Sequence, residues 1–181
     1  VQAIVAHSAR TAEDADALAR AVTGRLAALA RAQDALMADG TGGVALRDLA
    51  DAEARSFGPG RVCVSGPGVT VPARTGQAIA LLLHELMTNA AKYGALSVAE
   101  GRVTIRWRMA GDHLAEVEWR ETGGPPVAAE RRRGFGTELI EKIVAHELRQ
   151  PVALDFRPEG VVCVMRVPIR RPADFRIREN P

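Results

Sequence analysis

The stretch LLLHELMTNAAKYGAL, residues 81–96, decides how this sequence folds, because it combines an apolar ridge with regularly spaced polar side chains. At about 100° per residue, one ridge of the helix is formed by Ile79, Leu82, Leu83, Leu86 and Ala90. Glu85, Asn89 and Lys92 fall on a second ridge, rotated from the first by roughly a quarter to a third of a turn. A carboxylate, a carboxamide and an ammonium at the edge of a buried face suit the floor of a polar pocket. The alternative is a solvated helix edge, which is common on amphipathic helices.

The composition limits the classes of function. A length of 181 residues suits one domain with an appendage. The 24 basic and 22 acidic residues nearly balance, so charge gives no general argument for binding to nucleic acid or an anionic membrane. An aromatic content of 4% also weakens the case for base stacking. Neither a membrane-spanning apolar run nor a signal peptide is visible, so we expect a cytoplasmic region without membrane contact.

The two cysteines, Cys63 and Cys163, each lie in a short apolar run that reads as a strand. Their spacing resembles neither a metal site nor a disulfide framework. We therefore expect two buried free thiols.

Residues 1–38 are rich in alanine and leucine at helical intervals, which predicts a helical hairpin whose first arm is cut short where the sequence begins. Ser8, Thr11 and Asp14 are candidate caps near its turn. Residues 38–43, ADGTGG, break the helical pattern. We interpret the sequence as part of a longer protein with three parts: a helical hairpin at 1–40, a main domain at 44–169 and a C-terminal tail at 170–181.

Helical and strand patterns alternate after this break. VALRDLADAEARSF indicates an amphipathic helix, and a long helix is predicted from about Ala73 to Tyr93. RVCVS and VTV, on either side of GPG at 66–68, are predicted to pair as a short hairpin. Further hairpins are predicted to turn at AGDH and at PEG, with a helix at TELIEKIVAHEL between them. This order predicts an α+β, two-layer sandwich, in which a mixed, mostly antiparallel sheet carries helices on one face.

Three polar segments are candidates to converge on one site: HELMTNAAKY at 84–93, EWRETGGPP at 118–126 and GFGTEL at 134–139. An amide oxygen can ligate Mg²⁺, and glycines before a helix let backbone N–H groups approach a phosphate. Each glycine pair alone is more often an ordinary turn. Their combination and order favour a nucleotide pocket.

These segments together resemble the ATP-binding catalytic domain of bacterial sensor histidine kinases, in the superfamily shared with gyrase, Hsp90 and MutL. Within it, the sequence is similar to the HWE subfamily, which is marked by a histidine opening the N-box, here His84, and by a Trp-x-Glu pair, here Trp119 and Glu121. The resemblance covers essentially residues 1–169. It implies a two-layer ATPase sandwich that binds ATP without a P-loop.

The resemblance implies roles for the N-box residues. Asn89 is expected to ligate Mg²⁺, with Glu85 as the catalytic carboxylate beside it, positioning the metal or the nucleophile. Lys92 and Tyr93 are expected to face the phosphates, and Lys92 is one of only two lysines among 24 basic residues, which suits a dedicated phosphate contact. His84 is counted with the cofactor-binding residues, although a polar packing role stays open.

The glycine-rich segments are implied to hold the rest of the nucleotide. Glu121 takes the place of the aspartate that bonds the adenine amino group in most histidine kinases. Trp119 either walls the base or packs in the core, and packing is favoured. Arg131, Arg132 and Arg133 either close over the triphosphate, contact a partner or are solvated. The remaining expected nucleotide contacts are Gly123, Gly124, Gly134, Gly136, Thr137 and Leu139.

The resemblance implies a kinase that passes the γ-phosphoryl of Mg-ATP to a histidine, for relay to the receiver domain of a response regulator. The acceptor motif is expected upstream of Val1, because the context of His7, AHSART, does not match it. A homodimer through the helical hairpin is expected, and a monomer stays open. Two alternatives are a non-catalytic docking module with a regulatory or inert nucleotide site, and a serine-directed anti-sigma kinase. The latter normally lacks the hairpin.

Overall fold

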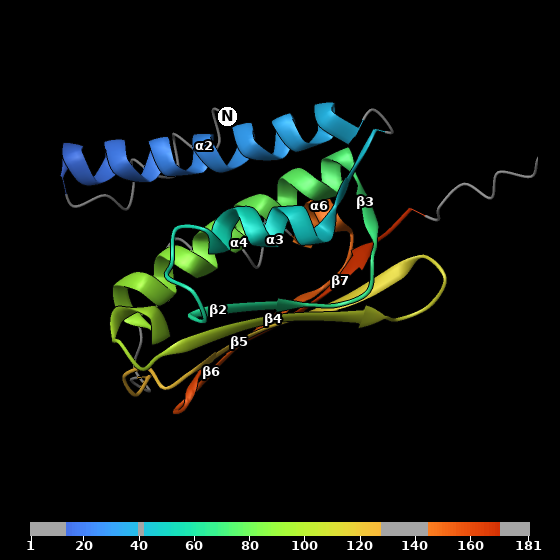
Figure 1. Ribbon diagram of the computed structural model, residues 1–181. Coiled ribbons are helices and arrows are strands. Elements are labelled where there is room, and N and C mark those ends of the chain that lie inside the picture. Colours follow the sequence, from blue (N-terminus) through green and yellow to red (C-terminus); the bar gives the residue numbers. More distant parts are fainter. Residues whose placement is uncertain (1–13, 40–41, 128–144, 171–181) are drawn as a thin grey trace, which may run out of the picture.

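The computed structural model describes residues 14–39, 42–127 and 145–170, and it arranges their elements in layers (Figure 1). A sheet forms one layer, helices α3 and α4 cover one of its faces, and helix α2 lies across these helices on the side away from the sheet. The elements in chain order are α2 (Ala15–Asp39), β1 (Gly43–Ala45), α3 (Leu46–Ala54), β2 (Val62–Ser65), β3 (Thr70–Pro72), α4 (Ala73–Tyr93), the 3₁₀ helix η1 (Ala95–Ser97), β4 (Arg102–Met109), β5 (Leu114–Thr122), α6 (Ala145–Leu148), β6 (Val152–Arg157) and β7 (Gly160–Pro168).

The main sheet has five strands in the order β2-β4-β5-β7-β6. Strands β2 and β4 are parallel, and every other neighbouring pair in this sheet is antiparallel. The hairpins β4-β5 and β6-β7 turn at AGDH and PEG, so both of these predictions are confirmed. The predicted α+β sandwich, with a mixed and mostly antiparallel sheet, is therefore confirmed as well.

The hairpin predicted around residues 66–68 is wrong. Strand β2 pairs with β4, where Cys63 lies opposite Thr104, whereas β3 pairs with β1, where Val71 lies opposite Val44. The intervening loop is held against β4, because the Trp107 indole Nε1–H donates to the Pro67 carbonyl oxygen at 2.7 Å. Beyond this loop the chain forms β3, which directly precedes α4.

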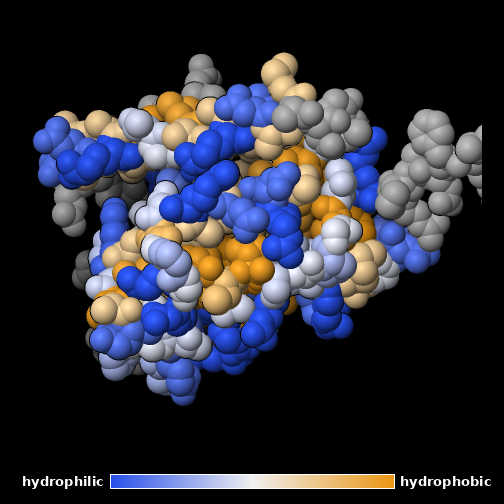
Figure 2. All heavy atoms as spheres, in the orientation of Figure 1, coloured by the Kyte–Doolittle hydropathy of each residue, from blue (hydrophilic) through white to orange (hydrophobic). Residues whose placement is uncertain are grey.

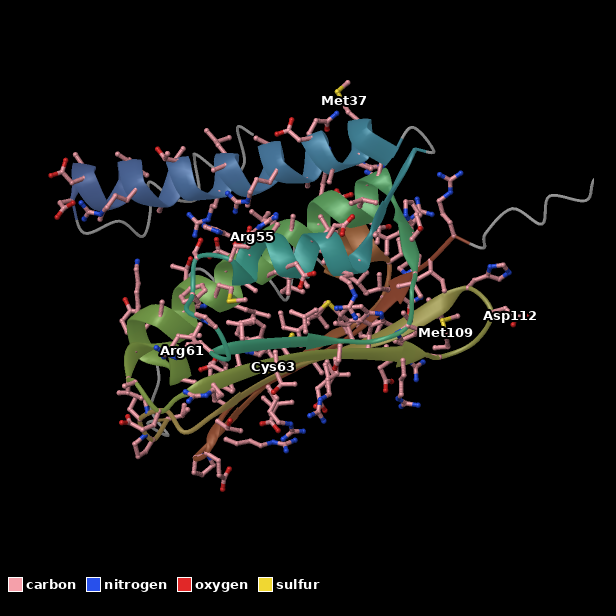
Figure 3. The ribbon with its side chains drawn as sticks, in the orientation of Figure 1. Met37, Arg55, Arg61, Cys63, Met109 and Asp112 are labelled. Atoms are coloured by element: carbon pink, nitrogen blue, oxygen red, sulfur yellow. The ribbon has the colours of Figure 1, made fainter. Side chains whose placement is uncertain are left out.

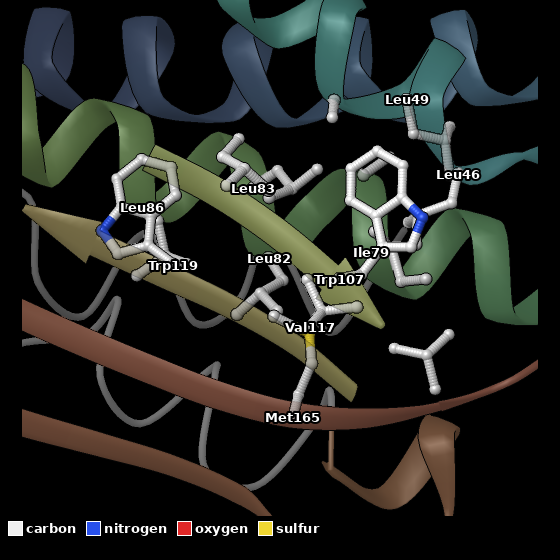
Figure 4. Close-up of a cluster of buried hydrophobic side chains, with 14 of the residues drawn as sticks. Leu46, Leu49, Ile79, Leu82, Leu83, Leu86, Trp107, Val117, Trp119 and Met165 are labelled. Carbon is white, nitrogen blue, oxygen red and sulfur yellow. The ribbon is translucent and has the colours of Figure 1, made fainter. Parts of the chain in front are cut away.

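The core lies between α4 and the sheet, where the apolar ridge of α4 meets the inward faces of β4 and β5 (Figure 4). Alternate residues of β5, among them Val117 and Trp119, point inward, as a strand period of two requires. Burial of each large apolar side chain contributes about 1.5–3 kcal/mol. Hydrophobic residues are visible through the middle of the molecule in Figure 2, with hydrophilic residues around them. The apolar ridge of α4 that faces this core includes Ile79, Leu82, Leu83 and Leu86.

The two cysteines differ in environment. Cys163 is buried in β7, and burial raises the pKa of its thiol to about 12. Cys63 is exposed on β2, so the prediction that it is buried is wrong (Figure 3). The reason is the alternation of this edge strand, in which Val62 and Val64 turn toward the core and Cys63 turns away.

Helix α2 begins where a cap was predicted. The Ala17 N–H donates to the Asp14 side-chain oxygen Oδ1 at 2.6 Å, which satisfies one of the free donors at the helix start. Ser8, Thr11 and the first arm of the expected hairpin lie outside the described residues. Among the described residues, no helix combines the length and the apolar character that crossing a membrane requires.

Candidate functional site

The polar ridge of α4 runs from the interior to the surface. Glu85 is buried, with 4% of its surface exposed, and Asn89, one helical turn later, is half-buried. Lys92 and Tyr93 are exposed at the end of the helix. The three polar side chains at i, i+4 and i+7 therefore span the boundary between the core and solvent, as their spacing predicted.

The end of α4 meets the end of β5. The Ala95 N–H, just after α4, donates to the buried Glu121 carboxylate at Oε2, at 2.8 Å. The chains approach so closely that a Cβ on Gly94 would collide with this carboxylate. A Cβ on Gly124 would lie 2.6 Å from the Ala95 Cα. The segments 84–93 and 118–126 are therefore brought together, and only glycine fits at these two points of contact.

Trp119 lies behind this contact. Its side chain is fully buried in the core, which confirms the packing interpretation. Its indole Nε1–H also points at Glu121 Oε1, at 3.4 Å. The two residues of the Trp-x-Glu pair thus face the same side of β5, because residues two apart on a strand share a face. Gly123 follows with a φ of +68°, a conformation that favours glycine.

Arg61 is a supporting residue that sequence reasoning missed. Its guanidinium donates to three backbone carbonyl oxygens after α4: Leu96 at 3.2 Å, Val98 at 2.6 Å and Gly101 at 3.1 Å (Figure 3). It therefore fixes the loop between η1 and β4, next to the contact of Ala95 with Glu121. The only signal in the sequence was an arginine opening the strand RVCVS.

Glu85 is paired with an arginine of α2. Arg25 Nε lies 2.6 Å from Glu85 Oε1, and Arg25 Nη2 lies 2.8 Å from Oε2. Both side chains are buried. Sequence reasoning missed this pair, although Arg25 shares a helical period with the buried residues Ala28 and Ala32 and so interrupts an apolar face.

His84 faces α2 and α3 rather than Glu121. Its Nδ1 lies 3.3 Å from Glu53 Oε2, and Arg31 of α2 pairs with the same carboxylate. Burial alone would raise the pKa of Glu53, but the hydrogen bonds with His84 and Arg31 outweigh it and lower the pKa. Within the part of the chain that the structure describes, His84 thus lies against Glu53 of α3 and Gly24 of α2.

Several expected site residues lie outside the described residues: Gly134, Gly136, Thr137, Leu139, Arg131, Arg132 and Arg133. A groove of about 360 Å³ lies between α2 and α3, lined by Arg31, Asp34, Asp48, Glu53 and several alanines. Neither Asn89 nor Glu121 lines it, so the groove is separate from the contact between α4 and β5.

Comparison with known sequences identifies the family. The family model of HWE histidine kinases matches residues 1–68. Over 162 residues, the chain is 35% identical to the blue-light-activated histidine kinase of Rhizobium johnstonii. The matched region covers 89% of this chain and 47% of that protein. The chain belongs to the HWE histidine kinase family. It spans about half the length of this curated relative.

Solved structures of histidine kinases share the fold. The histidine kinase domain of the Erythrobacter litoralis blue-light-activated histidine kinase EL346 superposes with a TM-score of 0.64 at 20% identity, covering 81% of this chain and 74% of that one. The ATP-binding domain of PrrB from Mycobacterium tuberculosis superposes with a TM-score of 0.52 at 19% identity, covering 71% of this chain and 97% of that one. The layered fold is thus that of histidine kinase catalytic domains.

Proposed function

We propose that this chain is the ATP-binding catalytic region of a sensor histidine kinase, which transfers the γ-phosphoryl of Mg-ATP to a histidine for relay to a response regulator. The observation that carries the proposal is the contact of Ala95 with Glu121. It joins the helix bearing Asn89 to the strand bearing the adenine-reading acid. Family membership supports the same reaction.

The donor set fits a magnesium nucleotide. Asn89 offers an amide oxygen at the half-buried part of α4, and Lys92 offers an exposed ammonium one turn beyond it. Mg²⁺ takes oxygen ligands and is usually shared between one or two protein groups, phosphate oxygens and water. When bound, it would neutralise charge on the phosphates. The close passage at Gly94 and Gly124 provides the tight backbone that the family's base pocket is expected to need.

Each residue then has one role. Asn89 ligates the metal, Lys92 and Tyr93 contact the phosphates, and Glu121 accepts from the adenine amino group. A histidine nitrogen attacks the γ-phosphorus, the bond from that phosphorus to the bridging oxygen of ADP breaks, and the imidazole proton passes to Glu85. The further nucleotide contacts are proposed to be Gly123, Gly124, Gly134, Gly136, Thr137 and Leu139, with His84 supporting Glu85 from the next position.

We extend the proposal to the partner protein, the oligomeric state and the domain bounds. The partner is the receiver domain of a response regulator in the cytoplasm, and two copies pair through the helical hairpin at 1–40. The ATPase domain spans 44–169, and the tail is 170–181. A monomer is the alternative to the homodimer.

A non-catalytic docking module is the second candidate function. The observation that favours it is the pairing of Glu85 with Arg25, because this pairing occupies the proposed catalytic acid. Mg-dependent nucleotide binding without any histidine phosphorylation would support this candidate.

Incubation with γ-labelled ATP tests the proposal. Residues 1–181 should bind nucleotide but retain no acid-labile label, because no histidine here lies in the family's acceptor context. A chain extended upstream of Val1 should gain acid-labile label on a histidine, and Asn89→Ala should abolish it. Label on His7 in the shorter chain would overturn the assignment of the acceptor. An extended chain that binds Mg-ATP and never gains label would favour the docking module.

A further inference from the structure

Two consecutive residues of α2 meet two consecutive residues of α4. Arg25 pairs with Glu85 through both carboxylate oxygens, at 2.6 and 2.8 Å. Its neighbour Gly24 faces the neighbouring His84, and a Cβ at position 24 would lie 2.8 Å from the His84 Nε2. Gly24 thus allows the close approach that lets Arg25 reach the acid.

Neither Gly24 nor the ion pair of Arg25 with Glu85 is expected to stabilise the folded protein by itself. Glycine has a low helix propensity, yet Gly24 lies inside a helix of 25 residues. A buried ion pair often contributes no more than a well-packed apolar pair, because both charges lose their hydration. A buried pair of this kind instead fixes one register of two elements, because breaking it leaves an unpaired charge.

The rest of the α2 interface suits a helix that docks reversibly. Among the residues of α2 whose burial is described, the fully buried ones are Arg25, Ala28, Ala32 and Leu36, of which only Leu36 is a large apolar side chain, whereas Leu18, Val22 and Leu29 are half-buried. A second polar contact at the same junction joins Arg31 to Glu53. In the described part of α2, the contact thus buries one arginine and two alanines completely, but only one large apolar side chain.

We propose that Arg25 is an inhibitory latch on the kinase site, holding Glu85 away from the reaction while α2 is docked. The inference rests on the proposed function, in which Glu85 takes the proton of the attacking histidine. Both oxygens of Glu85 are engaged by the guanidinium, so the carboxylate cannot turn toward a histidine nitrogen. Movement of α2 withdraws Arg25 and frees the acid, which couples the helical hairpin directly to phosphoryl transfer.

A reversible cross-link tests whether the docked arrangement is inactive. Gln33 of α2 and Gln77 of α4 hydrogen-bond across the interface at 3.0 Å and are accessible from solvent. Both become cysteine in a full-length protein that carries the acceptor histidine, with Cys63→Ser removing the exposed native thiol. A bis-methanethiosulfonate linker then joins them, and a reducing agent releases them. The Gln33→Cys single variant, treated in the same way, is the control.

The locked protein should bind Mg-ATP as before but phosphorylate its histidine more slowly, by about fivefold or more, the lower range of coupling between sites. Reduction should restore the rate. Equal rates before and after reduction would overturn the latch alone. Absence of label in both states would overturn the proposed function, and the latch with it.

Conservative substitution tests Arg25 itself. Arg25→Lys keeps the charge but loses the two-pronged contact, so histidine phosphorylation should rise by about twofold or more at unchanged ATP affinity. The control is Arg20→Lys, the same change at an exposed position of the same helix, and it should leave the rate unchanged. An Arg25→Lys protein that binds ATP normally and phosphorylates at or below the wild-type rate would overturn the proposal.

Discussion

The Ala95 N–H and the Glu121 carboxylate, 26 residues apart in the chain, form a buried hydrogen bond of 2.8 Å. Through it, the strand that ends at the glycine-rich segment holds the end of the helix that carries the N-box. The acid therefore has a structural partner as well as its proposed ligand. A carboxylate has about four lone-pair sites, so one hydrogen bond from the backbone does not by itself prevent it from accepting another.

Glu121→Gln should weaken binding of ATP more than binding of GTP, by on the order of 1–3 kcal/mol, the cost of spoiling a buried hydrogen bond to a charged group. The new amide would place donors where the adenine amino group and Trp119 Nε1 both need an acceptor. Calorimetric titration with both nucleotides measures the difference. Glu118→Gln, on the opposite face of β5, is the matched control and should leave both affinities unchanged. Equal losses for ATP and GTP in the Glu121 variant would contradict adenine recognition.

Asn89→Ala should remove the magnesium dependence of nucleotide binding. The wild-type protein should bind Mg-ATP in the micromolar to millimolar range, about −8 to −4 kcal/mol, and more weakly without the metal. Calorimetry with and without Mg²⁺ provides the comparison. Thr88→Ala, one residue earlier on α4, should retain the dependence. If the Asn89 variant titrates like the wild type, Asn89 is not the ligand.

Gly24→Ala should fail to stabilise the protein, although this substitution inside a helix normally gains about 1 kcal/mol. The added Cβ would lie 2.8 Å from the His84 Nε2, and the imidazole is held by Glu53 at 3.3 Å. In a His84→Ala background, the same substitution should raise the free energy of unfolding by about 1 kcal/mol. Urea unfolding of the four proteins gives the coupling between the two positions. An equal gain in both backgrounds would show that Gly24 and His84 do not touch.

Glu53→Gln should make stability less dependent on acid pH. Burial of Glu53 is outweighed by hydrogen bonds with His84 and Arg31, so its pKa is lowered from 4.5 in the folded state. The sign follows from linkage: the contribution is present above the unfolded pKa and is lost as pH falls through the folded pKa. The difference in free energy of unfolding between wild type and variant should thus be largest near pH 7 and shrink below pH 4.5. Asp155→Asn, at an exposed site, is the control, and a difference that is constant with pH would refute the assignment.

The sequence by itself determined most of the described elements and the inward faces of several of them, although Val44 and Ala45, which were assigned to a helix, form strand β1 with Gly43. The helix predicted from Ala73 to Tyr93 has those bounds, and its apolar ridge faces the core. The turns at AGDH and PEG were also readable. These features follow from local periods of 3.6 and 2 residues and from turn chemistry, which neighbouring residues set. The motifs around His84, Asn89 and Glu121 pointed to the family, which comparison with known proteins confirmed.

Only the tertiary structure decided which distant segments meet. It separated β2 from β3, because each strand pairs with a partner that local pattern does not name. It placed Cys63 on the solvent face of an edge strand, which follows from the position of β2 in the sheet. It also joined Arg25 to Glu85 across 60 residues of sequence. A helical period shows which face is polar, but a charged side chain is buried only when a second element brings its counter-ion, and that meeting depends on the packing of the whole domain.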